Sequence, residues 1–186
     1  MVECLARRIA AGAKRLLRAP ALRRLARRED GAVAIEFGLV AMPFFGVLLA
    51  TIETALVFFA GQVLETAVAD SSRLIMTRQA QSQNFDAAAF KNQVCAKASS
   101  LFDCAGIYVD VRTAASFASA NLSKPLDNLG NLLNNFTYQP GVAGDVVVVR
   151  IMYQWPIYLN FSGFNLTDMT GGKKLLMATA TFRNEP

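Results

Sequence analysis

The chain has 186 residues, a formal net charge of +5 and no histidine. That length suits one modest domain with an attached segment rather than two full domains. Without histidine there can be no His-based catalytic triad and no His-ligated zinc, and three cysteines are too few for a four-thiolate zinc site. Apolar residues make up 53% of the chain and charged residues 18%, against about 25% charged in an average soluble domain. The composition favours a membrane segment over an ordinary cytosolic enzyme.

The net positive charge of the chain comes from its first thirty residues. Residues 1–30 carry nine basic and three acidic side chains, whereas residues 31–186 carry ten basic and eleven acidic ones. A nucleic-acid site would normally belong to the folded domain and interleave aromatic residues, so we expect no nucleic-acid partner. We interpret residues 1–31 as a basic cytoplasmic leader. The spacing of its leucines and arginines also allows an amphipathic helix on the anionic inner leaflet.

A long apolar run follows the basic prefix. Residues 37–61 read FGLVAMPFFGVLLATIETALVFFAG and contain one charged residue, Glu53. A helix needs about 20 apolar residues to cross a bilayer core, and flanking arginines stay in the cytoplasm. We therefore predict a transmembrane helix over residues 32–61 with the N-terminus inside. A buried core helix and a cleavable secretory signal, whose apolar region is about 7–15 residues long, are the alternatives.

Two carboxylates and a proline mark this predicted helix. Glu36 lies at its cytoplasmic edge, and Glu53 lies deep within the apolar run. An ionised carboxylate at that depth is costly, so it is normally paired, protonated or turned toward protein. For Glu53 we consider two interpretations, snorkelling toward the outer interface and packing against other helices. Pro43 removes one backbone donor and can loosen or kink the helix.

Residues 28–43 read REDGAVAIEFGLVAMP, and this stretch resembles the TadE-like family, the minor pseudopilins of bacterial Tad (Flp) pilus systems. The resemblance rests on a basic tract, a glycine, a glutamate followed by an aromatic residue, and an early proline. The matching residues are Gly31, Ala32, Glu36, Phe37 and Pro43, and Glu53 falls where such proteins often carry a second glutamate. The resemblance implies that a prepilin peptidase cuts after Gly31 and leaves Ala32 as the new N-terminus. Glu36 would then face the free amine of a neighbouring subunit or its own.

The remainder, residues 62–186, is predicted to be a periplasmic α+β domain. The apolar periodicity of the helix continues to about residue 81, and Asp86 can cap a second helix. Strand patterns occupy residues 107–113, 145–153 and 174–183, with a loop and a short helix expected between the first two. Three or four antiparallel strands laid on the long helix give a pilin-like arrangement.

Cys95 and Cys104 would both lie on the periplasmic side, where a disulfide can form. The closed loop is short, so the expected gain in stability is about 2–3 kcal/mol. Two buried thiols are the alternative. The acidic residues of this domain are scattered, so the sequence predicts no catalytic residues, no metal site and no cofactor.

From these features we expect a component of pilus assembly rather than an enzyme, located in the bacterial inner membrane. Its expected partners are other pilin and pseudopilin subunits, pilus assembly proteins, a prepilin peptidase and the membrane itself, with no small-molecule substrate. The alternative is a single-pass membrane-anchored periplasmic binding or sensing module unrelated to pili.

Overall fold

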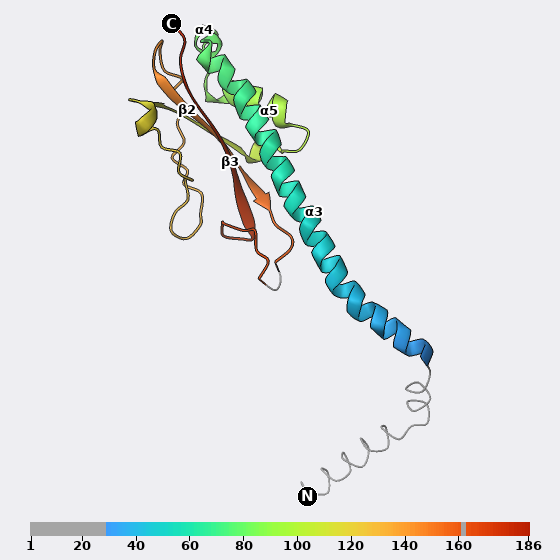
Figure 1. Cartoon of the computed structure of the whole chain (residues 1–186). Coiled ribbons are helices and arrows are strands. Elements are labelled where there is room, and N and C mark those ends of the chain that lie inside the picture. The colour runs from blue at the N-terminus through green and yellow to red at the C-terminus, as the bar shows by residue number, and fades with distance from the viewer. Residues whose placement is uncertain (1–28, 161–162) are drawn as a thin grey trace, which may run out of the picture. The chain divides into compact units, whose positions relative to one another are not determined.

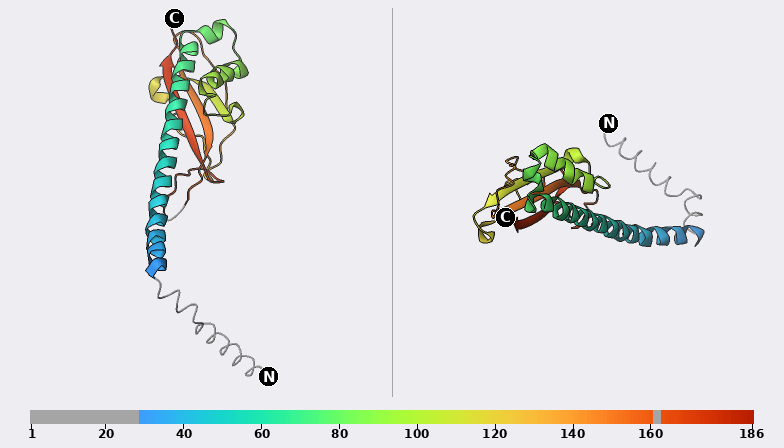
Figure 2. Two further views of the ribbon diagram at one scale, coloured as in Figure 1. Left: turned by 90° about the vertical axis from the view of Figure 1, so that its right-hand side faces the viewer. Right: turned by 90° about the horizontal axis from the view of Figure 1, so that it is seen from above.

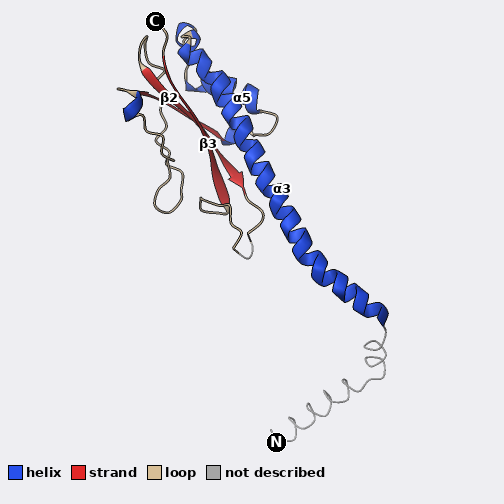
Figure 3. Ribbon diagram, in the orientation of Figure 1, coloured by secondary structure: helices blue, strands red, loops and turns tan. Residues whose placement is uncertain are grey.

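A computed structural model describes residues 29–160 and 163–186, so the leader predicted for residues 1–31 lies almost entirely outside the described residues. The structure is α+β, as predicted: a long apolar helix is followed by a small antiparallel sheet (Figures 1 and 3). The elements, in chain order, are α3 (Glu29–Met76), α4 (Gln79–Ser82), α5 (Ala87–Ala98), η1 (Cys104–Gly106), β1 (Ile107–Ala114), η2 (Phe117–Ser119), β2 (Val146–Pro156) and β3 (Lys173–Arg183).

Helix α3 is continuous over 48 residues and runs through Pro43. It ends at Met76, earlier than the periodicity predicted, because Arg78 adopts a left-handed conformation with φ 60°. The short helix α4 then follows as a separate element. By its internal contacts the chain divides into two units, one up to Leu49 and one from Ala50 to Pro186. The helix contributes to both, and each unit is described by itself.

The second unit contains a three-stranded antiparallel sheet in the order β1-β2-β3. At its centre Asp110 of β1 pairs with Arg150 of β2, which pairs with Thr179 of β3. The predicted strands are confirmed, with β2 reaching Pro156, three residues beyond its predicted end. The left-handed Gly171 and Gly172, with φ of 75° and 70°, form the turn before β3.

The connection between β1 and β2 is a loop, as predicted, but it lacks the short helix expected within it. No helix forms in residues 121–144; a short 3-10 helix, η2, precedes them instead. Part of this connection runs parallel to the free edge of β1, where Val111 donates its N–H to Thr137 at 2.8 Å and accepts from Gln139 at 2.9 Å. The segment therefore covers an edge that would otherwise leave backbone groups unpaired.

Helices α3 and α5 cover one face of the sheet, as the two views of Figure 2 show for this unit. Asp86 caps α5 as predicted, accepting a 2.7 Å hydrogen bond from the N–H of Ala89. The core contains the alternate strand residues that the period-two pattern placed on one face. Its fully buried members include Leu64, Ile75, Phe90, Val94, Ile107, Val111, Val147, Val149 and Ile151.

The C-terminal tail returns to the end of α3. The N–H of Glu185 donates to the carbonyl of Met76 at 2.9 Å. The side-chain amide of Asn184 donates to the carbonyls of Pro140 and Val142 at 2.8 and 3.1 Å. These bonds join the last residues of the chain to the helix and to the β1–β2 connection.

Candidate functional site

The first half of α3 presents apolar side chains outward. Among the described residues the chain has one helix long and apolar enough to cross a membrane, over Val33–Met76. Between residues 33 and 49 its exposed large apolar side chains are Val33, Ile35, Phe37, Leu39, Val40, Met42, Phe44, Phe45, Val47, Leu48 and Leu49. A soluble helix of this length would bury one such stripe in a core, whereas here apolar residues cover the whole circumference.

The predicted processing motif lies in the first turns of this helix. Gly31 is the third residue of α3, and a Cβ added there would meet no other atom within 4 Å. Glu36 and Phe37 follow on the exposed helix, with Phe37 71% exposed. The backbone at Gly31 is helical, so a peptidase that requires an extended segment would first have to unwind this turn.

Glu53 is one of the points at which the sheet domain contacts the helix. Its side chain is only 7% exposed. One carboxylate oxygen accepts the backbone N–H of Tyr158 at 2.6 Å, and the other accepts that of Leu159 at 3.2 Å. Both donors belong to the connection after β2. A carboxylate that accepts two backbone N–H groups is stabilised by charge-assisted bonds, so Glu53 has its partner within its own chain. The two interpretations of Glu53 drawn from the sequence, snorkelling toward the outer interface and packing against other helices, did not include this partner.

From Glu53 onward α3 has two different faces. Val57, Ala60 and Leu64 continue the buried side at helical spacing and pack against the sheet. On the opposite side Phe58 and Phe59 remain exposed, and Leu56 is exposed beside the buried face. The exposed apolar surface therefore extends past the point where the domain begins to cover the helix.

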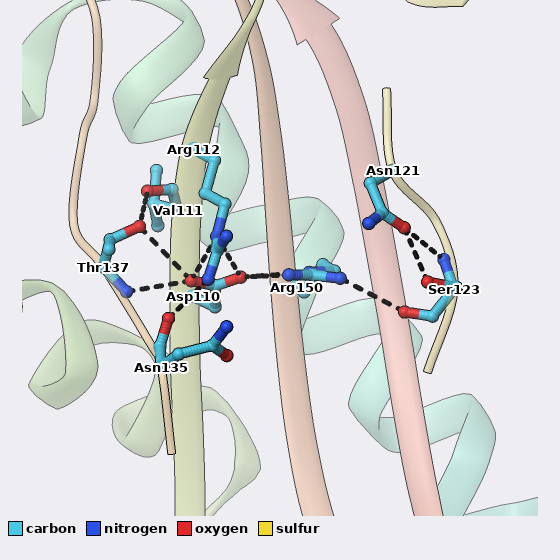
Figure 4. Close-up of polar contacts among 8 residues, drawn as sticks. All are labelled: Asp110, Val111, Arg112, Asn121, Ser123, Asn135, Thr137 and Arg150. Carbon is cyan, nitrogen blue, oxygen red and sulfur yellow. Dashed lines mark hydrogen bonds and ion pairs between the residues drawn. The ribbon is translucent and has the colours of Figure 1, made fainter. Parts of the chain in front are cut away.

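A buried ion network lies on the sheet face opposite the helices (Figure 4). Asp110 is fully buried and Arg150 is 5% exposed, and the Nε of Arg150 donates to the Asp110 carboxylate at 3.0 Å. The same carboxylate accepts from Arg112 at 3.0 Å and from the N–H of Thr137 at 2.9 Å. A further donor of Arg150 bonds the carbonyl of Ser123 at 3.1 Å. The network thus ties the β1–β2 connection to two strands.

The electrostatics of Asp110 reflect two opposing effects. Burial alone would raise the pKa of its carboxyl, but the hydrogen bonds from Arg150, Thr137 and Arg112 hold that pKa below its ordinary value. The period-two pattern placed Asp110 on the polar side of β1 and did not predict its burial. One signal could have revealed the pair: Arg150 is a charged residue inside an apolar run predicted to be a central strand, and a charge buried there needs a partner.

The remaining predicted residues are separate from this network. Cys95 of α5 and Cys104 of η1 are joined by a disulfide, with Cα atoms 5.5 Å apart. Of the other acidic residues of the domain, Asp127 bonds the nearby Asn131 at 3.0 Å, and Asp168 pairs with Lys124. Within residues 29–160 and 163–186 no group of three or more Cys, Asp or Glu side chains is placed to hold a metal ion.

These features define a class of protein: one long apolar helix, suited to crossing a membrane once, continues into a small α+β domain attached to it. The family model of TadE-like proteins matches residues 31–73, which confirms the resemblance over the motif and most of α3. Neither the curated proteins nor the solved structures contain a match to the chain.

Proposed function

We propose that this protein is a TadE-like minor pilin or pseudopilin that takes part in assembling a Tad (Flp) pilus. The observation that carries the proposal is the family match over residues 31–73, which includes the glycine-to-glutamate motif and the apolar helix. The continuity of that helix into an α+β domain supports it, because a pilin-like subunit needs one helix for assembly and one domain for contacts outside the membrane.

In the proposed arrangement the helix anchors the protein in the bacterial inner membrane. Residues 1–31 lie in the cytoplasm, and the sheet domain lies in the periplasm, because the basic prefix precedes the apolar run. The stretch from residue 33 to residue 52 provides 20 residues before Glu53 begins the attachment to the domain. That length meets the requirement of about 20 residues for a bilayer core.

Processing after Gly31 is part of the proposal. A cut there would free the amine of Ala32 and leave Glu36 near the new N-terminus. A carboxylate at the membrane edge is stabilised by a cation, and the amine of a neighbouring subunit would supply one. Gly38 and Gly46 lie on the same helix and would let a neighbouring helix approach closely. Pro43 leaves the helix intact, and its role in assembly remains part of this proposal.

Deletion of the gene with complementation by the full chain tests the function. Loss of surface pili in the deletion strain, restored by the full chain, is the expected result, together with recovery of the protein in the inner-membrane fraction. Mass spectrometry of the mature protein should show a chain beginning at Ala32. Normal piliation without the protein would instead favour the membrane-anchored binding or sensing module.

A further inference from the structure

The two outer edges of the sheet differ in how far they are covered. The edge of β1 is bonded by the β1–β2 connection, through Val111 with Thr137 and Gln139. On β3, alternate residues point their backbone N–H and C=O groups away from β2. Leu175 identifies this set, because its N–H donates at 2.6 Å to the side chain of Asp168, which lies outside the sheet.

The outward-pointing backbone groups of β3 are open over part of the strand. The next three residues of the set are Met177, Thr179 and Thr181. Within residues 29–160 and 163–186, no hydrogen bond joins the outward backbone groups of these three residues to another segment. The next bond on this side lies beyond β3, where the C-terminal tail bonds Met76. The edge of β3 therefore has an open stretch between two occupied ends.

This open stretch has none of the features that usually protect an edge strand. Residues 175–182 read LLMATATF, without a charged residue or a proline. The pairing of β3 with β2 is continuous from Lys173 to Arg183, so no bulge turns the edge away. Natural proteins commonly place charges, prolines or bulges on an edge strand, or cover it, because an unprotected edge pairs with another strand.

A groove lies beside the open edge. It is lined by Val68 and Ala69 of α3, by Leu122 of the β1–β2 connection and by residues 177–180 of β3. Helix α3 packs on one face of the sheet, and the connection bonds the ion network on the other face. A strand added along β3 would therefore direct alternate side chains toward the helix and toward Leu122, which is 55% exposed.

We propose that the open edge of β3 binds an extended segment of a different protein, which joins the sheet as an additional strand. Outward N–H and C=O groups that repeat every second residue match an extended backbone, and this mode of recognition adds a strand to a sheet edge. The inserted segment should carry uncharged, mainly apolar side chains, because the walls of the groove include Val68, Ala69 and Leu122.

The direction of β3 argues against a second copy bound through the same edge. The start of β3 lies near Glu53, because Gly172 bonds Ile157 and the next residue, Tyr158, bonds Glu53. Its end lies near Met76, so β3 and α3 run in the same direction. Two β3 edges related by a twofold axis would pair antiparallel and point their α3 helices in opposite directions. One bilayer could not hold both helices, a step that rests on the proposed membrane anchorage.

Photo-crosslinking in the native cells identifies what lies in the groove. The full-length protein carries a benzophenone amino acid in place of Leu122, or in place of Leu129, which is 76% exposed on the same connection and does not line the groove. We expect an adduct from position 122 that position 129 does not form. Mass spectrometry should assign the crosslinked peptide to a protein other than this chain.

Two threonine positions test whether the adduct depends on the edge. Thr179→Lys places a charge in the groove and should lower the adduct yield by about tenfold or more, because an unpaired charge is costly in an apolar contact. Thr179→Val stays uncharged and should retain the adduct. Thr113 is an exposed threonine on the other edge strand, so Thr113→Lys is the matched control. Far-UV circular dichroism and melting temperatures check that each variant is folded.

Hydrogen exchange tests the backbone pairing itself. The crosslink-free complex, extracted from native membranes in mild detergent, is compared with the full chain alone in the same detergent. The amides of Met177, Thr179 and Thr181 should exchange about tenfold or more slowly in the complex, because each gains a hydrogen bond.

Slower exchange at these amides, together with an edge-dependent adduct to a different protein, supports the proposal. Unchanged exchange, an adduct only to a second copy of this chain, or no adduct from position 122 overturns it. The gene deletion described above tests the pilus function separately. Normal piliation in the deletion strain with a protected β3 edge would remove the pilus role and leave the strand pairing in place.

Discussion

The carboxylate of Glu53 accepts the backbone N–H of Tyr158 at 2.6 Å, although 105 residues separate the two in the chain. This bond joins the helix to the connection between β2 and β3. It also explains how a glutamate is tolerated inside an apolar run, because the charge faces two backbone donors rather than lipid.

Removing this carboxylate should weaken the attachment. In Glu53→Ala the two loop N–H groups lose their acceptor, and an unsatisfied buried donor costs about 1–3 kcal/mol. We expect a loss of that size in the free energy of unfolding, measured by urea titration of the full chain in detergent. Glu53→Gln keeps one acceptor oxygen and should lose less. Glu65 is an exposed glutamate on the same helix, so Glu65→Ala is the matched control. Equal effects of the two alanine variants would contradict the role given to Glu53.

The ion pair between Asp110 and Arg150 should be among the most sensitive points of the domain. Asp110→Asn leaves the Arg150 guanidinium buried without a counter-charge, and breaking a buried pair typically costs about 3–5 kcal/mol. The partly exposed pair of Lys124 and Asp168 provides the comparison, since Lys124→Met should change the free energy of unfolding by less than about 1 kcal/mol. Urea titrations of both variants measure the two losses in free energy of unfolding. Similar small losses would show that the buried pair of Asp110 and Arg150 does not stabilise the fold more than the pair of Lys124 and Asp168.

The lowered pKa of Asp110 predicts acid sensitivity with a defined sign. Because the folded-state pKa lies below the ordinary value of 3.8, the carboxylate stabilises the fold fully above that pH. This contribution is lost as the pH falls from about 3.8 toward the folded-state pKa. Melting temperatures of the wild-type chain and of Asp110→Asn should therefore differ most at neutral pH and converge in acid. A constant difference down to pH 2 would contradict the assignment.

The disulfide between Cys95 and Cys104 should stabilise the domain modestly. It closes a loop with a sequence separation of nine residues, and the chain-entropy estimate for so short a loop is about 2–3 kcal/mol. The double variant Cys95→Ala, Cys104→Ala should lose about that much free energy of unfolding. Thiol labelling of the folded, non-reduced Cys4→Ser protein should find no reactive thiol. Two reactive thiols would instead support the alternative of unpaired cysteines.

The assembly role proposed for Glu36 predicts a separation between processing and piliation. Glu36→Ala should still be cut after Gly31 but should reduce surface pili strongly, because the new amine would lack its carboxylate partner. Electron microscopy counts the pili, and mass spectrometry of the N-terminus reports the cut. Glu65→Ala again serves as the control and should leave both unchanged. Normal piliation with Glu36→Ala would remove this residue from the assembly mechanism.

Much of the fold could be predicted because it depends on local periodicity. The apolar run predicts α3, Asp86 predicts the start of α5, and the period-two alternation predicts the strands. The end of α3 was harder, since the left-handed Arg78 has no strong local signal. The β1–β2 connection is a loop, as predicted, but the short helix expected in it does not form within residues 121–144, because the segment is ordered by bonds to strands.

The contacts that matter most to the candidate site were not predictable in the same way. Asp110 and Arg150 are 40 residues apart and meet only through strand register. Glu53 is unusual within an apolar run, but its partners are two backbone N–H groups, which any sequence could supply. Neither the register between distant strands nor the choice of a backbone N–H as a partner can be predicted from the residue pattern of a single sequence.

The bonds of the C-terminal tail have a mechanical consequence. A pull on the carboxyl terminus would first load the bond from Glu185 to Met76 and the two bonds from the Asn184 side chain. While they hold, tension is transferred to the end of α3 and to the β1–β2 connection, and β3 is not peeled from the sheet. Together with the backbone bonds of Asn184 to Asp145 and Gly144, these bonds would resist a pull on the carboxyl terminus before the rest of β3 separates from β2.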